Sequence, residues 1–193
     1  MTAFVSQTAP DFSADAYDNG NFKQISLAGF KGKKVVLFFY PLDFTFVCPT
    51  EILAFADTLE EFKKRDTVVL GCSVDSKFTH NAWAQLPREE GGIKGVNFPL
   101  ISDLNKTIAR DYGILLDAGI SLRGLFIINK DGVLKHATIN HLDLGRNISE
   151  VLRLLDAIDY SEAHGEVCPA NWERGKKAMK PDSESLKQYM KSR

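Results

Sequence analysis

Cysteine is scarce in this 193-residue sequence: there are three, an odd number, and no two lie at C-x-x-C spacing. The odd count excludes a structural disulfide framework. The spacing excludes a zinc ribbon and a C-x-x-C dithiol site. Long hydrophobic runs are also absent, because no apolar stretch approaches the roughly 18–20 residues that a helix needs to span a bilayer.

An excess of charge of either sign is missing as well. Twenty-four basic residues face 25 acidic ones, which leaves a net charge of −1. This balance gives no case for a nucleic-acid or membrane partner. The first residues lack a basic segment followed by an apolar one, so we expect no signal peptide and a cytoplasmic protein.

Motifs for cofactors and metals are not found. There is no G-x-G-x-x-G or Walker A motif, so a nucleotide cofactor is unsupported. The four histidines are His80, His136, His141 and His164. They have no metal-ligand spacing among themselves or with the cysteines. We therefore expect no cofactor, no metal, and structural or solvent-exposed histidines.

Short apolar runs alternate with amphipathic segments along the chain. The runs at 34–40, 67–74 and 122–129 predict buried strands, and 133–139 predicts a strand paired to the third run through a turn. Helical spacing predicts one helix of about 14 residues after Pro49 and others at about 78–85, at about 104–112 after a Ser102-Asp103 cap, and from 148.

The order strand, helix, strand, helix, hairpin, helix predicts an α/β protein. The expected architecture is a thioredoxin-like fold with a central mixed β-sheet flanked by helices, plus a C-terminal arm. Composition changes after Tyr160, so we expect a domain over 1–160 and an arm over 161–193. The last dozen residues fit either a disordered tail or an ordered arm with a mobile tip, and we favour the arm.

Cys48 lies between a predicted strand and a predicted helix, and Pro49 suits the first helical turn. At a helix N-terminus, free backbone N–H groups and the positive end of the helix dipole favour a thiolate. Such a thiolate is a nucleophile and is open to oxidation. The alternative is an ordinary buried cysteine, which is the interpretation that we prefer for Cys72 within its apolar strand.

Three other side chains are candidates for the same site. Thr45, three residues before Cys48, either caps the helix or faces the sulfur. Glu51 either complements the helix dipole or holds an arginine. Arg123 opens a buried strand, where a charge is costly without a partner, so it either points at the Cys48 sulfur or stays at the surface.

Several motifs in this sequence resemble those of one known protein family. Residues 39–51, FYPLDFTFVCPTE, resemble the peroxidatic-cysteine motif of typical 2-Cys peroxiredoxins, with Pro41, Thr45 and Cys48 at its P-x-x-x-T-x-x-C positions. Arg123 matches the family's active-site arginine. The segment 165–169, GEVCP, resembles the resolving-cysteine motif around Cys168. The resemblance extends over nearly the whole chain.

The resemblance implies a mechanism. Cys48 thiolate would attack hydrogen peroxide or an organic hydroperoxide and become a sulfenic acid. Thr45 and Arg123 would hold the peroxide oxygens, and Pro41 would shield the sulfenate from water. Cys168 of a partner subunit would then form an intersubunit disulfide with Cys48. Thioredoxin or a dedicated flavoprotein disulfide reductase would restore the thiols, and the protein would form homodimers that assemble into decamers.

The sequence departs from easily overoxidised members at two places. Their Gly-Gly-Leu-Gly segment reads GGIKG at 91–95 here, and their Tyr-Phe pair reads Tyr189-Met190. We expect moderate resistance to overoxidation. A thioredoxin-type oxidoreductase is disfavoured because position 51 is Glu51 rather than cysteine. A redox sensor uses the same residues and stays open, as does the peroxide preference. A holdase chaperone stays open only as a second activity, since nothing in the sequence supports it as the main one.

Overall fold

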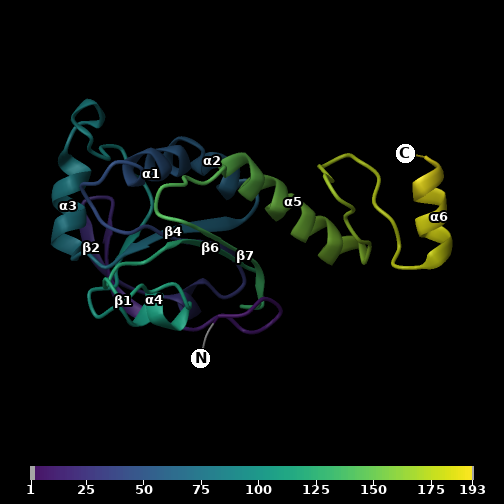
Figure 1. Cartoon of the computed structure of the whole chain (residues 1–193), viewed down its shortest axis with the longest axis horizontal. Coiled ribbons are helices and arrows are strands. Elements are labelled where there is room, and N and C mark those ends of the chain that lie inside the picture. Colours follow the sequence, from purple (N-terminus) through teal and green to yellow (C-terminus); the bar gives the residue numbers. More distant parts are fainter. Residues whose placement is uncertain (1–2, 193) are drawn as a thin grey trace. The chain divides into compact units, whose positions relative to one another are not determined.

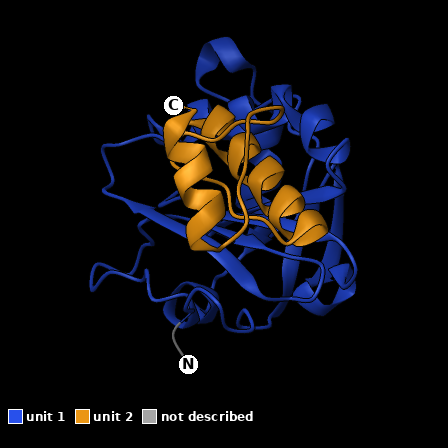
Figure 2. Ribbon diagram, turned by 90° about the vertical axis from the view of Figure 1, so that its right-hand side faces the viewer, with its two compact units in different colours: residues 1–146 blue, residues 147–193 orange. Residues whose placement is uncertain are grey.

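The computed structural model describes residues 3–192. The chain divides into two compact units, Met1–Arg146 and Asn147–Arg193, coloured separately in Figure 2. The expected boundary between 160 and 161 stays a prediction.

The first unit is built on a seven-stranded mixed sheet (Figure 1). Its spatial order is β2-β1-β5-β4-β3-β6-β7. Strands β3, β4 and β5 are parallel, and the remaining pairs are antiparallel. The strands are β1 Ser13–Asp18, β2 Asn21–Ser26, β3 Lys34–Phe39, β4 Thr67–Ser73, β5 Leu100–Ser102, β6 Arg123–Ile128 and β7 Leu134–Asn140.

The unalternating apolar runs are central strands because both faces of the sheet are covered. All six residues of β3 and all six of β6 are buried. Phe38 of β3 stacks on Phe55 of the helix α1 (Cys48–Asp57), with ring centroids 4.3 Å apart. The next side chain, Phe39, points to the opposite face, where its ring lies 5.4 Å from that of Tyr112. In Figure 1, α1 and α2 (Leu59–Lys63) lie on one side of the sheet, and α4 (Thr107–Asp111) lies on the other.

The prediction of a single helix after Pro49 is wrong, because the structure has two helices there. They are α1 Cys48–Asp57 and α2 Leu59–Lys63. Thr58 separates them with φ −104° and ψ 3°. Its hydroxyl donates to the Ala54 carbonyl at 2.7 Å. Such a bond from a side chain to the backbone competes with the helix ladder, so the apolar periodicity continues while the helix does not.

The other helices of this unit are α3 Lys77–Gln85 and α4 Thr107–Asp111. The helix expected from about 104 therefore begins three residues later, because Lys106 adopts a left-handed conformation with φ 60°. Asp103 still caps this helix from a distance of several residues. Its carboxylate accepts from Ile108 N at 3.0 Å and from Ala109 N at 2.8 Å. Two short 3-10 turns lie at Leu27–Phe30 and Arg88–Glu90.

The apolar runs described above do not predict the hairpin of β1 and β2. Its turn is Asn19-Gly20, with φ 47° and 84°, and Asn-Gly is the pair that a tight hairpin turn favours. This signal was present in the sequence. Strand β5 has three residues, which is too short for a periodic pattern.

The second unit contains α5 Ile148–His164 and α6 Ser183–Lys191. Asn147 caps α5 by accepting from Glu150 N at 3.3 Å, and Gly165, with φ 64°, ends it. Asp182 caps α6 by accepting from Ser185 N at 2.7 Å. Helix α6 lies within the last dozen residues, and the ordered arm with a mobile tip stays a prediction. Over residues 3–192, no helix is long and apolar enough to cross a membrane.

Replacing Phe55 by alanine should lower the free energy of unfolding by about 3–5 kcal/mol, because it leaves a cavity under the α1 helix. Urea unfolding measures this loss. The matched control is Phe4→Ala, since Phe4 is 67% exposed and its loss should cost less than about 0.5 kcal/mol. Equal losses for the two variants would contradict the packing described here.

Candidate active site

Cys48 is the first residue of α1, and Pro49 lies in the same first turn. It follows the loop that leaves β3 at the centre of the sheet, and its side chain is fully buried. The predicted position at a helix N-terminus is therefore confirmed. The positive end of the helix dipole favours negative charge on a sulfur placed there.

Arg123 is the first residue of β6, and its guanidinium points at the Cys48 sulfur as expected. Nη1 donates to Cys48 Sγ at 3.5 Å. The same nitrogen donates to Glu51 Oε2 at 2.6 Å, and Nε donates to the Leu142 carbonyl at 2.7 Å. With its side chain only 3% exposed, Arg123 is a fixed cation beside the sulfur rather than a surface residue.

Glu51 joins Arg123 to a second buried arginine, Arg146. Glu51 Oε2 accepts from Arg146 Nη2 at 2.8 Å, and Oε1 accepts from the Arg146 backbone N–H at 2.9 Å. Two roles were considered for Glu51: complementing the helix dipole and holding an arginine. The structure shows Glu51 holding arginines.

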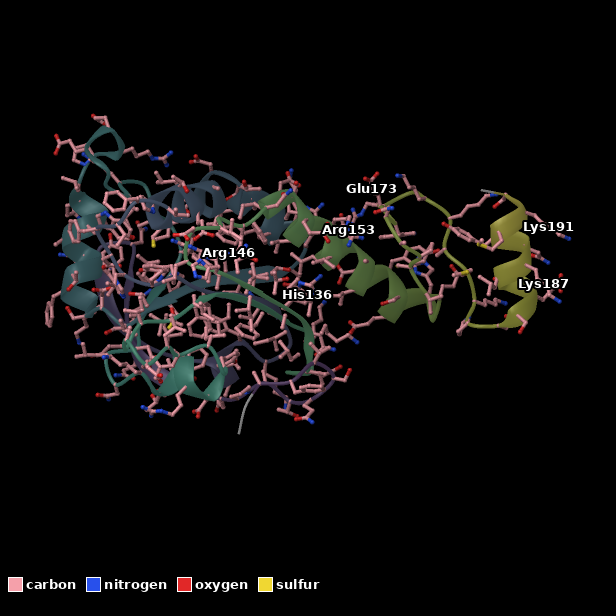
Figure 3. All side chains as sticks on the ribbon, viewed as in Figure 1. His136, Arg146, Arg153, Glu173, Lys187 and Lys191 are labelled. Atoms are coloured by element: carbon pink, nitrogen blue, oxygen red, sulfur yellow. The ribbon has the colours of Figure 1, made fainter. Side chains whose placement is uncertain are left out.

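Arg146 is the site residue that sequence reasoning missed. Its Nη1 donates to the carbonyls of Phe39 at 2.7 Å and Gly124 at 2.9 Å, so it ties the end of β3 to the start of β6. Its guanidinium lies 5.2 Å from the centre of the Phe38 ring. Burial lowers the pKa of Arg146 to about 10, so the group stays charged at neutral pH. Figure 3 labels it in the interior of the first unit.

The balance of charge at this site is positive. Two guanidinium groups face one carboxylate, which leaves one uncompensated positive charge in a buried place. Burying an unpaired charge is costly, and an anion close by removes that cost. A thiolate at Cys48 would be that anion.

Thr45 and Pro41 lie in the loop between β3 and α1. The Thr45 hydroxyl donates to the Leu42 carbonyl at 2.9 Å, which leaves its oxygen lone pairs for another donor. Phe44, just before it, has a left-handed φ of 54°, and a non-glycine residue pays a cost for this conformation. Pro41 is buried.

A buried polar cluster holds this loop in place. His80 Nδ1 lies 2.7 Å from Asp43 Oδ2, and the Tyr40 hydroxyl donates to Asp43 Oδ1 at 2.9 Å. The Asp43 backbone N–H donates to Asp75 Oδ2 at 2.8 Å. Burial raises the pKa of Asp43, although His80 opposes this. His80 is thus structural, and the strain at Phe44 is balanced by contacts made by its neighbour.

The other two cysteines differ from Cys48. Cys72 is fully buried in β4, and burial, together with the charge of Asp103, raises the pKa of its thiol well above the usual range. Cys168 lies in the second unit, is partly exposed, and donates to the Ala157 carbonyl at 3.6 Å. The structure brings Cys48, Arg123 and Glu51 together and places Thr45 and Pro41 in the adjoining loop.

No group of three or more His, Cys, Asp or Glu side chains within residues 3–192 is arranged to hold a metal ion.

Comparison with known proteins agrees with this geometry. Residues 5–137 match the model of the AhpC/TSA family, and residues 157–192 match that of the C-terminal domain of 1-Cys peroxiredoxin. A thioredoxin peroxidase of Echinococcus granulosus is 52% identical over 193 residues, with all of both chains covered. Peroxiredoxin-2 of Mus musculus is 53% identical over 188 residues, which cover 97% of this chain and 95% of the mouse protein.

Among solved structures, reduced 2-Cys peroxiredoxin of Plasmodium vivax is similar with a TM-score of 0.96 and 46% identity, covering 98% of this chain and 99% of its own. The chain belongs to the AhpC/TSA family of peroxiredoxins. It has their thioredoxin-like fold and is a thiol-dependent peroxidase.

Cys72 should not react with iodoacetamide at pH 8 in the folded protein, because it is buried and its thiol keeps its proton. Its ionisation is favoured only in the unfolded chain, so Cys72 lowers the stability of the fold as the pH rises above the pKa of an unfolded thiol. Mass mapping of the labelled sites checks this, with urea-unfolded protein as the fully labelled control. Labelling of folded Cys72 at the rate of Cys168 would contradict its burial.

Proposed function

We propose that Cys48 is the peroxidatic cysteine and Cys168 the resolving cysteine of an antioxidant enzyme that reduces hydrogen peroxide and organic hydroperoxides. The observation that carries the proposal is the contact between Arg123 Nη1 and Cys48 Sγ, 3.5 Å long, at the start of α1. It places a fixed cation beside a sulfur that lies at the positive end of a helix dipole. A cation and a helix N-terminus both stabilise a thiolate, and a cation also stabilises the charge that develops on a peroxide oxygen.

In the first step, the Cys48 thiolate attacks the terminal peroxide oxygen. The O–O bond breaks, the sulfur becomes a sulfenic acid, and water or an alcohol leaves after protonation. Arg123 and the backbone N–H of Cys48 donate to the peroxide oxygens, and the Thr45 hydroxyl accepts from the peroxide proton. Buried Pro41 keeps water from the sulfenate.

In the second step, the thiol of Cys168 from a partner subunit condenses with the sulfenic acid, which gives a disulfide and one molecule of water. Because the Cys48 side chain is fully buried in the first turn of α1, that turn must unwind for the second sulfur to reach it. A dithiol reductant then restores both thiols. The name of the Echinococcus relative favours thioredoxin over a dedicated flavoprotein reductase.

We also propose a homodimer that assembles into decamers and acts in the cytoplasm. Strand β7 is the last in the sheet and lacks a neighbour on its outer side within residues 3–192. An open edge of this kind is a site for pairing with a second chain. The exposed rings of Phe22 and Phe78, 5.1 Å apart, form a separate apolar patch for a second contact between subunits.

One equivalent of hydrogen peroxide tests the two-cysteine cycle. Wild type and Cys72→Ser should give a covalent dimer on non-reducing electrophoresis, whereas Cys48→Ser and Cys168→Ser should not. Intact mass identifies the oxidation state of each sulfur. A monomeric wild type whose Cys48 stops at the sulfenic acid would contradict the role of Cys168.

A further inference from the structure

The second unit holds Cys168 against one face of α5. Its thiol donates to the Ala157 carbonyl at 3.6 Å. Arg153 and Tyr160 lie on the same face, since residues four and seven apart on a helix are neighbours. Both make contacts with the segment that carries Cys168, and each contact lies within the second unit.

Arg153 fixes the downstream end of this segment. Its Nη1 donates to the Trp172 carbonyl at 2.8 Å. The same guanidinium is oriented by Glu150, whose carboxylate accepts from Nε at 2.6 Å and from Nη2 at 2.8 Å. An arginine held at two nitrogens presents the third with little further loss of freedom. Figure 3 labels Arg153 on α5 and Glu173 just beyond Trp172.

Tyr160 fixes the upstream end. Its hydroxyl donates to Glu166 Oε2 at 2.7 Å, and its ring centroid lies 5.0 Å from that of Trp172. Val167 is held separately, by a two-way backbone pairing with Met179 at 2.8 and 3.3 Å. Cys168 therefore lies between anchored residues on both sides.

This arrangement is unsuited to reaction at the Cys168 sulfur. Its S–H bond is directed at a carbonyl oxygen, and a sulfur in that position cannot approach a second sulfur without giving up the contact. Burial raises the pKa of the Cys168 thiol, the negative charge of Glu166 adds to this, and Arg153 opposes it. Because the thiolate is the attacking species, the held form is also the less reactive form.

We propose that Arg153 and Tyr160 are positioning residues that clamp Cys168 on α5, and that release of this clamp sets the rate of disulfide formation. The inference rests on the proposed function, in which Cys168 resolves the Cys48 sulfenic acid. The sulfenic acid has two fates: condensation with Cys168, which releases water, or reaction with a second peroxide to the sulfinic acid. A tighter clamp favours the second fate.

The clamp lies outside the two segments in which this chain departs from easily overoxidised relatives, 91–95 and Tyr189-Met190. It therefore acts on the balance between disulfide and sulfinic acid in addition to any effect of those segments. A variant of the clamp should change this balance without a change at Cys48.

Two variants loosen the clamp while keeping its charges and most of its volume. Tyr160→Phe removes only the bond to Glu166. Arg153→Lys keeps the charge but cannot hold the Glu150 carboxylate through two nitrogens while a third binds the Trp172 carbonyl. Each should form the disulfide roughly 2- to 10-fold faster, as expected for the loss of one hydrogen bond from the held state. The peroxide concentration that converts half of Cys48 to sulfinic acid should rise by the same factor.

The chain offers matched controls in the first unit. Tyr112→Phe also loses one hydroxyl bond, to the Pro10 carbonyl at 2.9 Å. Arg65→Lys also loses an arginine that bonds a carbonyl and a carboxylate, both of Glu61, at 2.9 and 3.0 Å. Both controls should form the disulfide at the wild-type rate.

Rapid mixing with peroxide, acid quench and intact mass would follow sulfenic acid, disulfide and sulfinic acid in every variant. The rate of Cys48 oxidation should be unchanged throughout. Unchanged or slower disulfide formation in both clamp variants, with a normal wild type, would overturn the clamp. Failure of wild type to form the disulfide would overturn the proposed function instead, and Cys168→Ser gives the reference for that outcome.

Discussion

The active site and the sheet beneath it depend on one buried carboxylate. Glu51 holds two arginines, Arg123 at 2.6 Å and Arg146 at 2.8 Å. Without it, two cations would repel one another in the interior, and removing one partner of a buried charge pair costs about 3–5 kcal/mol. With it, Arg123 is aimed at the Cys48 sulfur, and Arg146 reaches the backbone of β3 and β6. The same carboxylate thus serves the site and the sheet beneath it.

Much of this site could be predicted because its signals are local. Cys48 lies between an apolar run and an amphipathic segment, and Arg123 interrupts the start of another apolar run. Arg146 had no such signal. It stands in a loop just before a helix cap, and its burial depends on the ends of β3 and β6 lying side by side, which no pattern near residue 146 records.

The errors in the fold have equally specific causes. Thr58 divides a helix whose apolar spacing continues across it, because a hydroxyl-to-backbone bond leaves the periodicity of side chains untouched. Lys106 delays the start of α4 while Asp103 still caps it. The hairpin of β1 and β2 was predictable from Asn19-Gly20, whereas β5 was not, since three residues show no period.

We propose that Glu51 speeds the reaction of Cys48 with peroxide, because it fixes Arg123 beside the sulfur. The most direct measurement is the second-order rate constant of Cys48 with hydrogen peroxide in Glu51→Gln, with the fold checked by circular dichroism. We expect a rate roughly 10- to 100-fold below wild type in a folded protein, because the donor to the developing charge is no longer held. A folded Glu51→Gln variant that reacts within about twofold of wild type, less than 0.5 kcal/mol in barrier by the usual conversion, would contradict it.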